Sequence, residues 1–263
     1  MPLIDSHSHV DQYDASEIPA ILDRARGAGL GMIIVAGTTV ESSRNAVTLS
    51  HGHPIVYGGV GLHPADLTGP LDDETADILR QLAADPRVVV WSETGLDYLE
   101  SSPPREVQDQ AFRAQIRLAI EAKLPLVVHS REAHPDMLRL LHEEHASDVG
   151  GIFHYFQGDL ATAEAAMDMG FDISMAKPLL RLPELQEVAA KLPLARMVLE
   201  TDSFPQPFKK HRDRWTEPWH LPQVAEKLAE LQGISVDEVT AATTANVLRV
   251  LGGRVSLSDL QQG

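Results

Sequence analysis

Cysteine is absent from this chain of 263 residues. Its absence excludes disulfide bonds and thiolate metal sites, and it fits a reducing compartment. No apolar run reaches the length that crosses a membrane, and the opening residues, MPLIDSHSHV, lack the basic and long apolar stretches of a signal peptide. We therefore expect a cytoplasmic protein that makes no contact with membranes.

The sequence has few basic residues relative to acidic ones. The 22 lysines and arginines face 38 aspartates and glutamates, which gives a formal net charge of -16. Such an acidic surface argues against broad, nonspecific coating of DNA. It leaves room for a local basic groove, so the overall charge alone does not exclude nucleic acid as a partner.

No glycine-rich phosphate fingerprint follows the first apolar run, which disfavours an open dinucleotide-binding sheet. The chain instead alternates short β-branched runs with longer segments of helical spacing, a pattern typical of a parallel sheet. The eight runs are 3–10, 31–37, 54–61, 87–93, 124–130, 150–156, 171–176 and 196–202. Eight repeats in a chain of this length predict an α/β fold, a closed (β/α)8 TIM barrel.

The segments between the runs show helix signals. In 105–123, Phe112, Ile116 and Ile120 recur on one helix face, and near the C-terminus Ser235 and Glu238 have the spacing of a capping box. No linker or low-complexity stretch interrupts the chain, so we predict a single hydrolase domain over 1–263. We expect 252–263 to be a loose tail.

Ionisable side chains stand at the ends of the apolar runs, where a parallel barrel collects its chemistry. They are His7, His9, His63, Glu93, His129, His154 and Asp202. Taken alone, each has an ordinary explanation as a packed or exposed side chain. Their coincidence at the same end of separate strands predicts a metal site.

His7 and His9 are two residues apart, so in a strand both side chains point the same way and can grip one ion. Imidazoles and carboxylates without thiolate suit zinc, manganese or magnesium. The set exceeds what one tetrahedral ion needs. We therefore predict two divalent ions that share one carboxylate, and Glu93 is the best placed bridge.

Six motifs make the sequence resemble the TatD family of metal-dependent deoxyribonucleases, within the amidohydrolase-like TIM barrels. The motifs are DSHSHV, GLHP, SETGLDY, PLVVHSRE, FHYFQG and LETDS, and the resemblance spans Leu3 to Leu251. It implies that His7, His9, Glu93 and Asp202 hold one ion, and that Glu93, His129 and His154 hold the second. It also places His63 and Arg131 near the substrate phosphate.

The sequence departs from the usual family pattern in positions that we expect to line the substrate cleft. They are Ser92, Tyr155, Gln157, Phe204 and Thr216. We therefore expect these departures to affect substrate preference rather than metal binding. Arg131 has an alternative role in an ion pair with a neighbouring acidic side chain.

The mechanism that the resemblance implies is attack on a phosphodiester by a metal-activated water. Asp202 would orient and deprotonate the water, and Glu93 would bridge the ions. Lys209 and Lys210 lie in the one locally basic segment, 204–220, among aromatic residues that suit a nucleic-acid strand. We predict DNA as the partner, through single strands or ends, with trimming from the 3′ end.

Three alternatives remain open. The aromatic residues of 204–220 could pack beneath the barrel rim instead of stacking on bases. The enzyme could be an amidohydrolase or lactonase, although Glu93 stands where many such barrels place a carbamylated lysine and Lys177 follows a different run. A binding protein that has lost catalysis is the third, which the intact ligand set disfavours.

Overall fold

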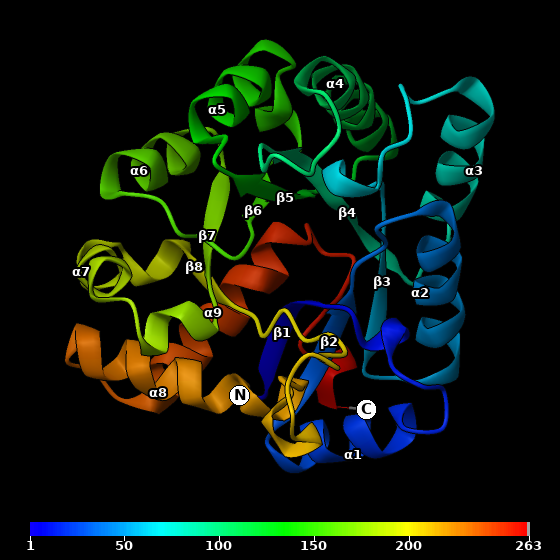
Figure 1. Cartoon of the computed structure of the whole chain (residues 1–263). Helices are drawn as coiled ribbons and strands as arrows, with labels where there is room; N and C mark the ends of the chain where they lie inside the picture. The colour runs from blue at the N-terminus through cyan, green and yellow to red at the C-terminus, as the bar shows by residue number, and fades with distance from the viewer. Residues whose placement is uncertain (262–263) are drawn as a thin grey trace.

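A barrel of parallel strands surrounded by helices forms the body of the molecule (Figure 1). The computed structural model describes residues 1–261. The strands are β1 Leu3–Ser8, β2 Leu30–Val35, β3 Val56–Val60, β4 Val88–Asp97, β5 Leu126–Arg131, β6 Gly151–Phe153, β7 Phe171–Met175 and β8 Met197–Leu199. Each pairs in parallel with the next, in the order β1 to β8. The predicted (β/α)8 fold is confirmed.

The helices surround the strands, except for the last one, which lies across one end of the barrel (Figure 1). They are α1 Ile18–Gly27, α2 Val40–Gly52, α3 Asp73–Ala83, α4 Arg105–Ala122, α5 His134–Glu143, α6 Leu160–Asp168, α7 Pro183–Lys191, α8 Leu221–Gln232 and α9 Val236–Val250. Phe112 and Ile116 of α4 are buried, as their spacing predicts, and α9 begins with the expected capping box of Ser235 and Glu238. Within residues 1–261, no helix is both long and apolar enough to span a membrane.

Strands β4, β6 and β8 differ in length from the sequence prediction, and this affects the site. β4 continues to Asp97, and its pairing with β5 shifts register between Trp91 and Thr94. β6 and β8 have three residues each, so His154 and Asp202 follow their strands rather than lie within them. The side chains that matter therefore stand on short segments fixed by the ends of the strands.

The barrel closes between β8 and β1 through individual contacts, since no ladder among the described residues joins these two strands. The Asp202 amide donates to the His7 carbonyl at 3.0 Å, and the His9 amide donates to the Ser203 carbonyl at 2.8 Å. The buried Asp5 adds a side-chain link to the segment after β8. Its Oδ1 accepts from the Thr201 amide at 2.9 Å, and its Oδ2 accepts from the Thr201 hydroxyl.

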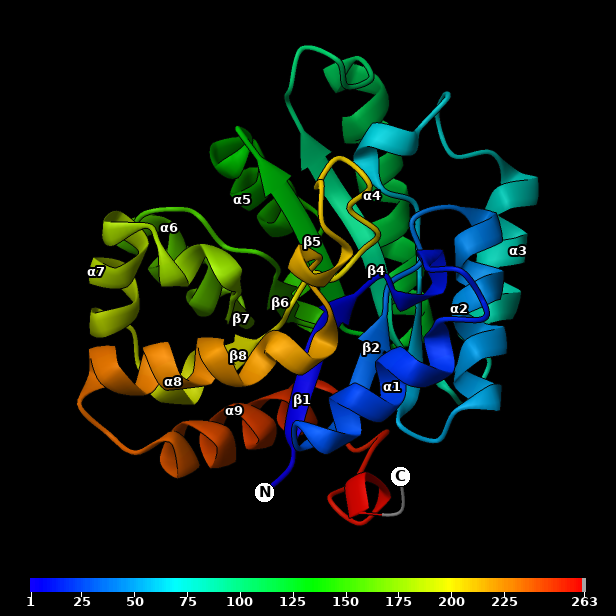
Figure 2. The ribbon, with the colours of Figure 1, turned by 60° about the horizontal axis from the view of Figure 1, so that its bottom comes forward.

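Helix α9 and the segment after it close the end of the barrel where the strands begin (Figure 2). Val247 and Leu251 pack against the inward-facing residues of the strands, together with the buried Val255 and Leu260. The segment that we expected to be loose thus packs through Leu260, while residues 262–263 lie outside the described part of the chain. With this end filled, the opposite end, the mouth, is left to hold a site.

Candidate metal centre

The predicted histidines and carboxylates meet at the mouth of the barrel. A cavity of about 650 Å³ opens there, and His9, Glu93, His129, His154 and Asp202 are among the residues that line it. Glu93 lies at the register shift of β4 and is 3% exposed, with its amide bonded to the Gly37 carbonyl. The bulged strand thus brings a buried carboxylate to the centre of the group.

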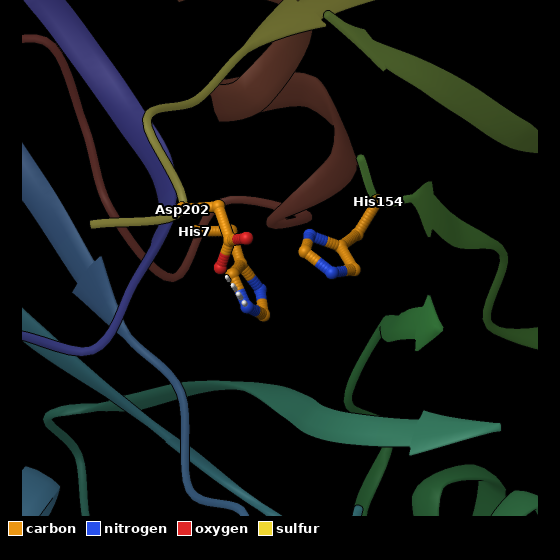
Figure 3. Close-up of side chains that lie close together, drawn as sticks. All are labelled: His7, His154 and Asp202. Atoms are coloured by element: carbon orange, nitrogen blue, oxygen red, sulfur yellow. Dashed lines mark ion pairs between the residues drawn. The ribbon is translucent and has the colours of Figure 1, made fainter. Parts of the chain in front are cut away.

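Four side chains, those of His7, His9, Glu93 and Asp202, lie close together at the β1 side of this group. Figure 3 shows two of them, His7 and Asp202, with His154 beside them. Nε2 of His7 lies 3.2 Å from Nε2 of His9, and Glu93 Oε2 lies 3.3 Å and 3.5 Å from these two atoms. Asp202 Oδ1 lies 3.4 Å from Nε2 of His9 and 3.9 Å from Nε2 of His7. Ligands placed about 2.0–2.2 Å from a tetrahedral ion lie about 3.3–3.6 Å from one another. The arrangement therefore fits a divalent cation.

The other oxygen of Glu93 faces a second group of imidazoles. Glu93 Oε1 lies 3.0 Å from Nδ1 of His129, 3.2 Å from Nε2 of His154 and 3.4 Å from Nε2 of His63. His63, Glu93 and His129 are close enough together to hold one ion. Glu93 can thus serve two cations, one through each oxygen. His63, which the family resemblance places near the substrate phosphate, thus also lies where it could contact a metal ion.

Two buried carboxylates hold the rings of His129 and His154 from behind. Nε2 of His129 lies 3.0 Å from Asp97 Oδ2, and Nδ1 of His154 lies 2.8 Å from Glu200 Oε1. Such partners fix the ring orientation and tautomer of a metal-binding histidine. Neither carboxylate is among the site residues predicted from the sequence. Asp97 stands four residues after Glu93, and Glu200 stands two before Asp202, so the two-residue period of a strand could have placed them near the site.

The histidines and carboxylates of this group shift one another's pKa values. Burial raises the pKa of Glu93, but the imidazoles of His63, His154 and His7 outweigh it and hold that pKa well below its usual range. Burial lowers the pKa of His9, yet the hydrogen bond that its ring donates to Asp202 and the charge of Glu93 raise that pKa to about 9. The carboxylates therefore stay ionised next to the rings, as ligands for a cation must.

Three residues at the mouth have left-handed backbone conformations that are unusual for residues other than glycine. The φ angles are 49° for Asp202, 46° for Tyr155 and 54° for Glu132, and all three residues line the cavity. Each such conformation typically costs about 1–3 kcal/mol and concentrates at functional sites. The backbone strain supports a functional role for this cavity.

The structure places the predicted substrate residues in different settings. Arg131 lines the cavity, and its guanidinium lies 3.4 Å from Asp97 Oδ2, so it faces the cavity and also forms the alternative ion pair. Lys209 and Lys210 do not line the cavity. Lys209 instead donates to Gln206 Oε1 and the Arg214 carbonyl, whereas Lys210 is exposed.

The aromatic residues of 204–220 divide between packing and exposure. The Arg212 guanidinium lies over the rings of Tyr13 and Trp215 and pairs with Glu217, so its charge is used within the protein. Phe208, in contrast, is 74% exposed. Of the positions that depart from the family pattern, Tyr155, Gln157 and Phe204 line the cavity as expected. Ser92 and Thr216 are buried away from it.

The fold and the site together define a class of protein: a (β/α)8 barrel whose mouth carries a histidine and carboxylate centre suited to divalent cations. Comparison with known proteins makes the class specific. Residues 4–252 match the profile of the family described as TatD related DNase. The chain belongs to this family of metal-dependent hydrolases.

Individual relatives agree with this assignment. The chain is 33% identical to YabD of Bacillus subtilis, an uncharacterized metal-dependent hydrolase, over 94% of this chain and 98% of that one. It is 33% identical to the 3'-5' ssDNA/RNA exonuclease TatD of Erwinia amylovora, over 90% and 95%. The crystal structure of YjjV, a TatD homologue from Escherichia coli, matches with a TM-score of 0.86 at 30% identity, over 94% and 97%.

Proposed function

We propose that this protein is a phosphodiesterase that removes nucleotides from the 3′ ends of single-stranded nucleic acid, with two divalent cations at the mouth of the barrel. The observation that carries the proposal is the position of Glu93, whose two oxygens face two separate groups of imidazoles. With a single ion, one of these two groups of imidazoles would have no cation to bind. The Erwinia relative named as an exonuclease supports the substrate class.

The proposed ligand sets are those that the family resemblance implies, and the distances around Glu93 are compatible with them. His7, His9, Glu93 and Asp202 would hold one ion. Glu93, His129 and His154 would hold the other, with His63 Nε2 beside them. When bound, divalent cations supply Lewis acidity, which makes water more acidic and offsets the negative charge of phosphate oxygens.

Asp202 is the side chain that we assign to orienting and deprotonating the attacking water. Its side chain is 19% exposed, against 3% for that of Glu93, so it can contact a water in the cavity while an oxygen remains beside His9. Arg131 offers a planar pair of donors to a phosphate, and half of its side chain is exposed at the rim.

A single strand suits the cavity better than a duplex. The cavity has a volume of about 650 Å³, in the range that encloses one small ligand. A base of a duplex would therefore have to separate from its partner before it could enter. The rings of Tyr155 and Phe204 line the cavity and can stack on a base. An unpaired strand end meets these requirements without unwinding.

A competing function has one observation in its favour. Among the described residues that line the cavity, Arg131 is the one lysine or arginine, and Asp66 and Glu132 add negative charge. A small substrate with little charge, such as a lactone or amide, would tolerate this surface. The two functions are separated by offering both kinds of substrate to the same preparation.

The test uses oligothymidylate labelled at its 5′ end, the matching oligoribonucleotide and a simple lactone, each with magnesium, manganese or zinc. We expect stepwise shortening of the 5′-labelled strand and slow turnover of the lactone. The Glu93→Ala variant should lose nuclease activity under every metal. Efficient lactone hydrolysis without shortening of any oligonucleotide would replace the proposal with the competing function.

A further inference from the structure

Two lysines converge beside the mouth on a buried polar pair. Nζ of Lys177, in the short helix Lys177–Leu180 after β7, donates to the Thr216 hydroxyl at 3.2 Å. Nζ of Lys209 donates to Gln206 Oε1, which also accepts from the Thr216 amide at 3.0 Å. Gln206 and Thr216 are 7% and 3% exposed, so these buried residues hold both ammonium groups in position.

Within residues 1–261, these positive charges have no carboxylate partner. Among the described residues, neither Lys177 nor Lys209 forms an ion pair, and the same holds for the nearby Arg181. Burial lowers the pKa of Lys177, and the charges of Lys209 and Arg181 lower it further. In a chain with a net charge of -16, carboxylates are plentiful. Their absence here leaves the repulsion between cations to be relieved by an external anion.

The lysine pair is close to the cavity of the metal centre. Phe204 lines that cavity, and Gln206 follows it by two residues, a separation of at most about 7 Å between the Cα atoms. The charges of both Asp202 and Arg181 influence the pKa of Tyr155, which also lines the cavity. Figure 2 shows the segment between β8 and α8 at the end of the barrel toward which the arrowheads of β4 and β5 point.

We propose that Lys177 and Lys209, flanked by Arg181, form a phosphate-binding subsite separate from the metal centre. It takes a phosphate of the substrate other than the one that is cut. The inference rests on the proposed function, and it explains how a cavity with one arginine can accept a polyanion: the neighbouring phosphate binds outside the cavity, on the lysine pair.

The experiment compares substrates that differ by one phosphate. Thymidylyl-thymidine (dT2) contains only the phosphate that is cut, whereas dT3 and 5′-phosphorylated dT2 carry one more. Loss of one charge-assisted contact should raise KM for dT3 about tenfold in Lys177→Ala and in Lys209→Ala, and leave KM for dT2 unchanged. Lys177→Arg keeps the charge and should stay near the wild type.

Lys191→Ala is the matched control, because it removes the same charge from the end of α7 that is remote from the mouth. Thermal denaturation identifies any variant that fails to fold, and Lys209→Ala tests the subsite independently of the more buried Lys177. An effect on 5′-phosphorylated dT2 but not on dT3 would assign the subsite to a terminal phosphate. An effect on both would assign it to any neighbouring phosphate.

Equal changes in KM for all three substrates, or no change in any of them, would overturn the subsite. A wild-type protein that cleaves none of the three would refute the proposed function instead. The binding of 5′-phosphorylated dT2 by calorimetry then judges the subsite without turnover. We expect weaker binding in Lys177→Ala than in Lys191→Ala, and equal affinities would contradict the subsite.

Discussion

Glu200 offers a sharp test of how the protein prepares its metal ligands. The carboxylate is fully buried, lies 2.8 Å from Nδ1 of His154 and accepts from the Tyr155 amide at 2.7 Å and the Ser174 hydroxyl at 2.6 Å. Glu200→Gln keeps the shape and can keep all three hydrogen bonds, because a hydroxyl can also accept from the new amide. The negative charge behind the imidazole is what the substitution removes.

The expected magnitude follows from the role of such carboxylates. Loss of a partner behind a metal-binding histidine typically weakens metal affinity about ten- to hundredfold, which corresponds to about 1.4–2.8 kcal/mol. We expect zinc affinity of Glu200→Gln, measured by competition with a chromophoric chelator, to fall in this range. Excess metal should restore most of the activity.

Ser174→Ala serves as the control, since it removes one hydrogen bond to Glu200 and leaves the charge in place. Its zinc affinity should stay within about threefold of the wild type, as expected for loss of one indirect hydrogen bond. A folded Glu200→Gln protein with wild-type zinc affinity would refute the reasoning, because it would show that the charge behind His154 does not act on the metal.

Three further predictions concern stability, metal uptake and substrate. Burial raises the pKa of Asp5 to about 8, so folding stability should fall as pH rises from about 4 through 8. In Asp5→Asn the melting temperature should change less over this range. The same dependence of melting temperature on pH in the variant and the wild type would contradict the shift. Because the pKa of His9 is raised to about 9, protons compete with a metal ion for its imidazole. Below pH 8 the metal affinity should therefore weaken by about tenfold per pH unit for each proton that the metal displaces. A metal affinity that does not change with pH would argue against His9 as a ligand. Arg131→Ala should raise KM for oligonucleotides about tenfold or more with kcat little changed, and an unchanged KM would leave Arg131 only its pairing with Asp97.

The repeat of runs and helices predicts the barrel because each element signals itself locally. The same logic places His7 and His9 on one face and gathers the other ligands at one end, since parallel strands share a direction. The register shift near Glu93 is different in kind, because it depends on the pairing of β4 with β5, which a single run of residues does not reveal.

Long-range partners account for most of what the sequence leaves out. Arg212 is balanced by Glu17 and Glu217, of which Glu17 lies far away in the chain, so its use inside the protein cannot be inferred from the basic segment itself. The same holds for the packing of Leu260 beneath the barrel and for the meeting of Lys177 with Thr216. Such contacts follow only once the closed fold brings distant segments together.

Anomalous diffraction from crystals grown with manganese or zinc would locate the bound cations directly. We expect two peaks, one among His7, His9 and Asp202 and the other beside His129 and His154, with Glu93 between them. A single peak, or peaks away from these side chains, would contradict the paired metal centre on which the proposed function depends.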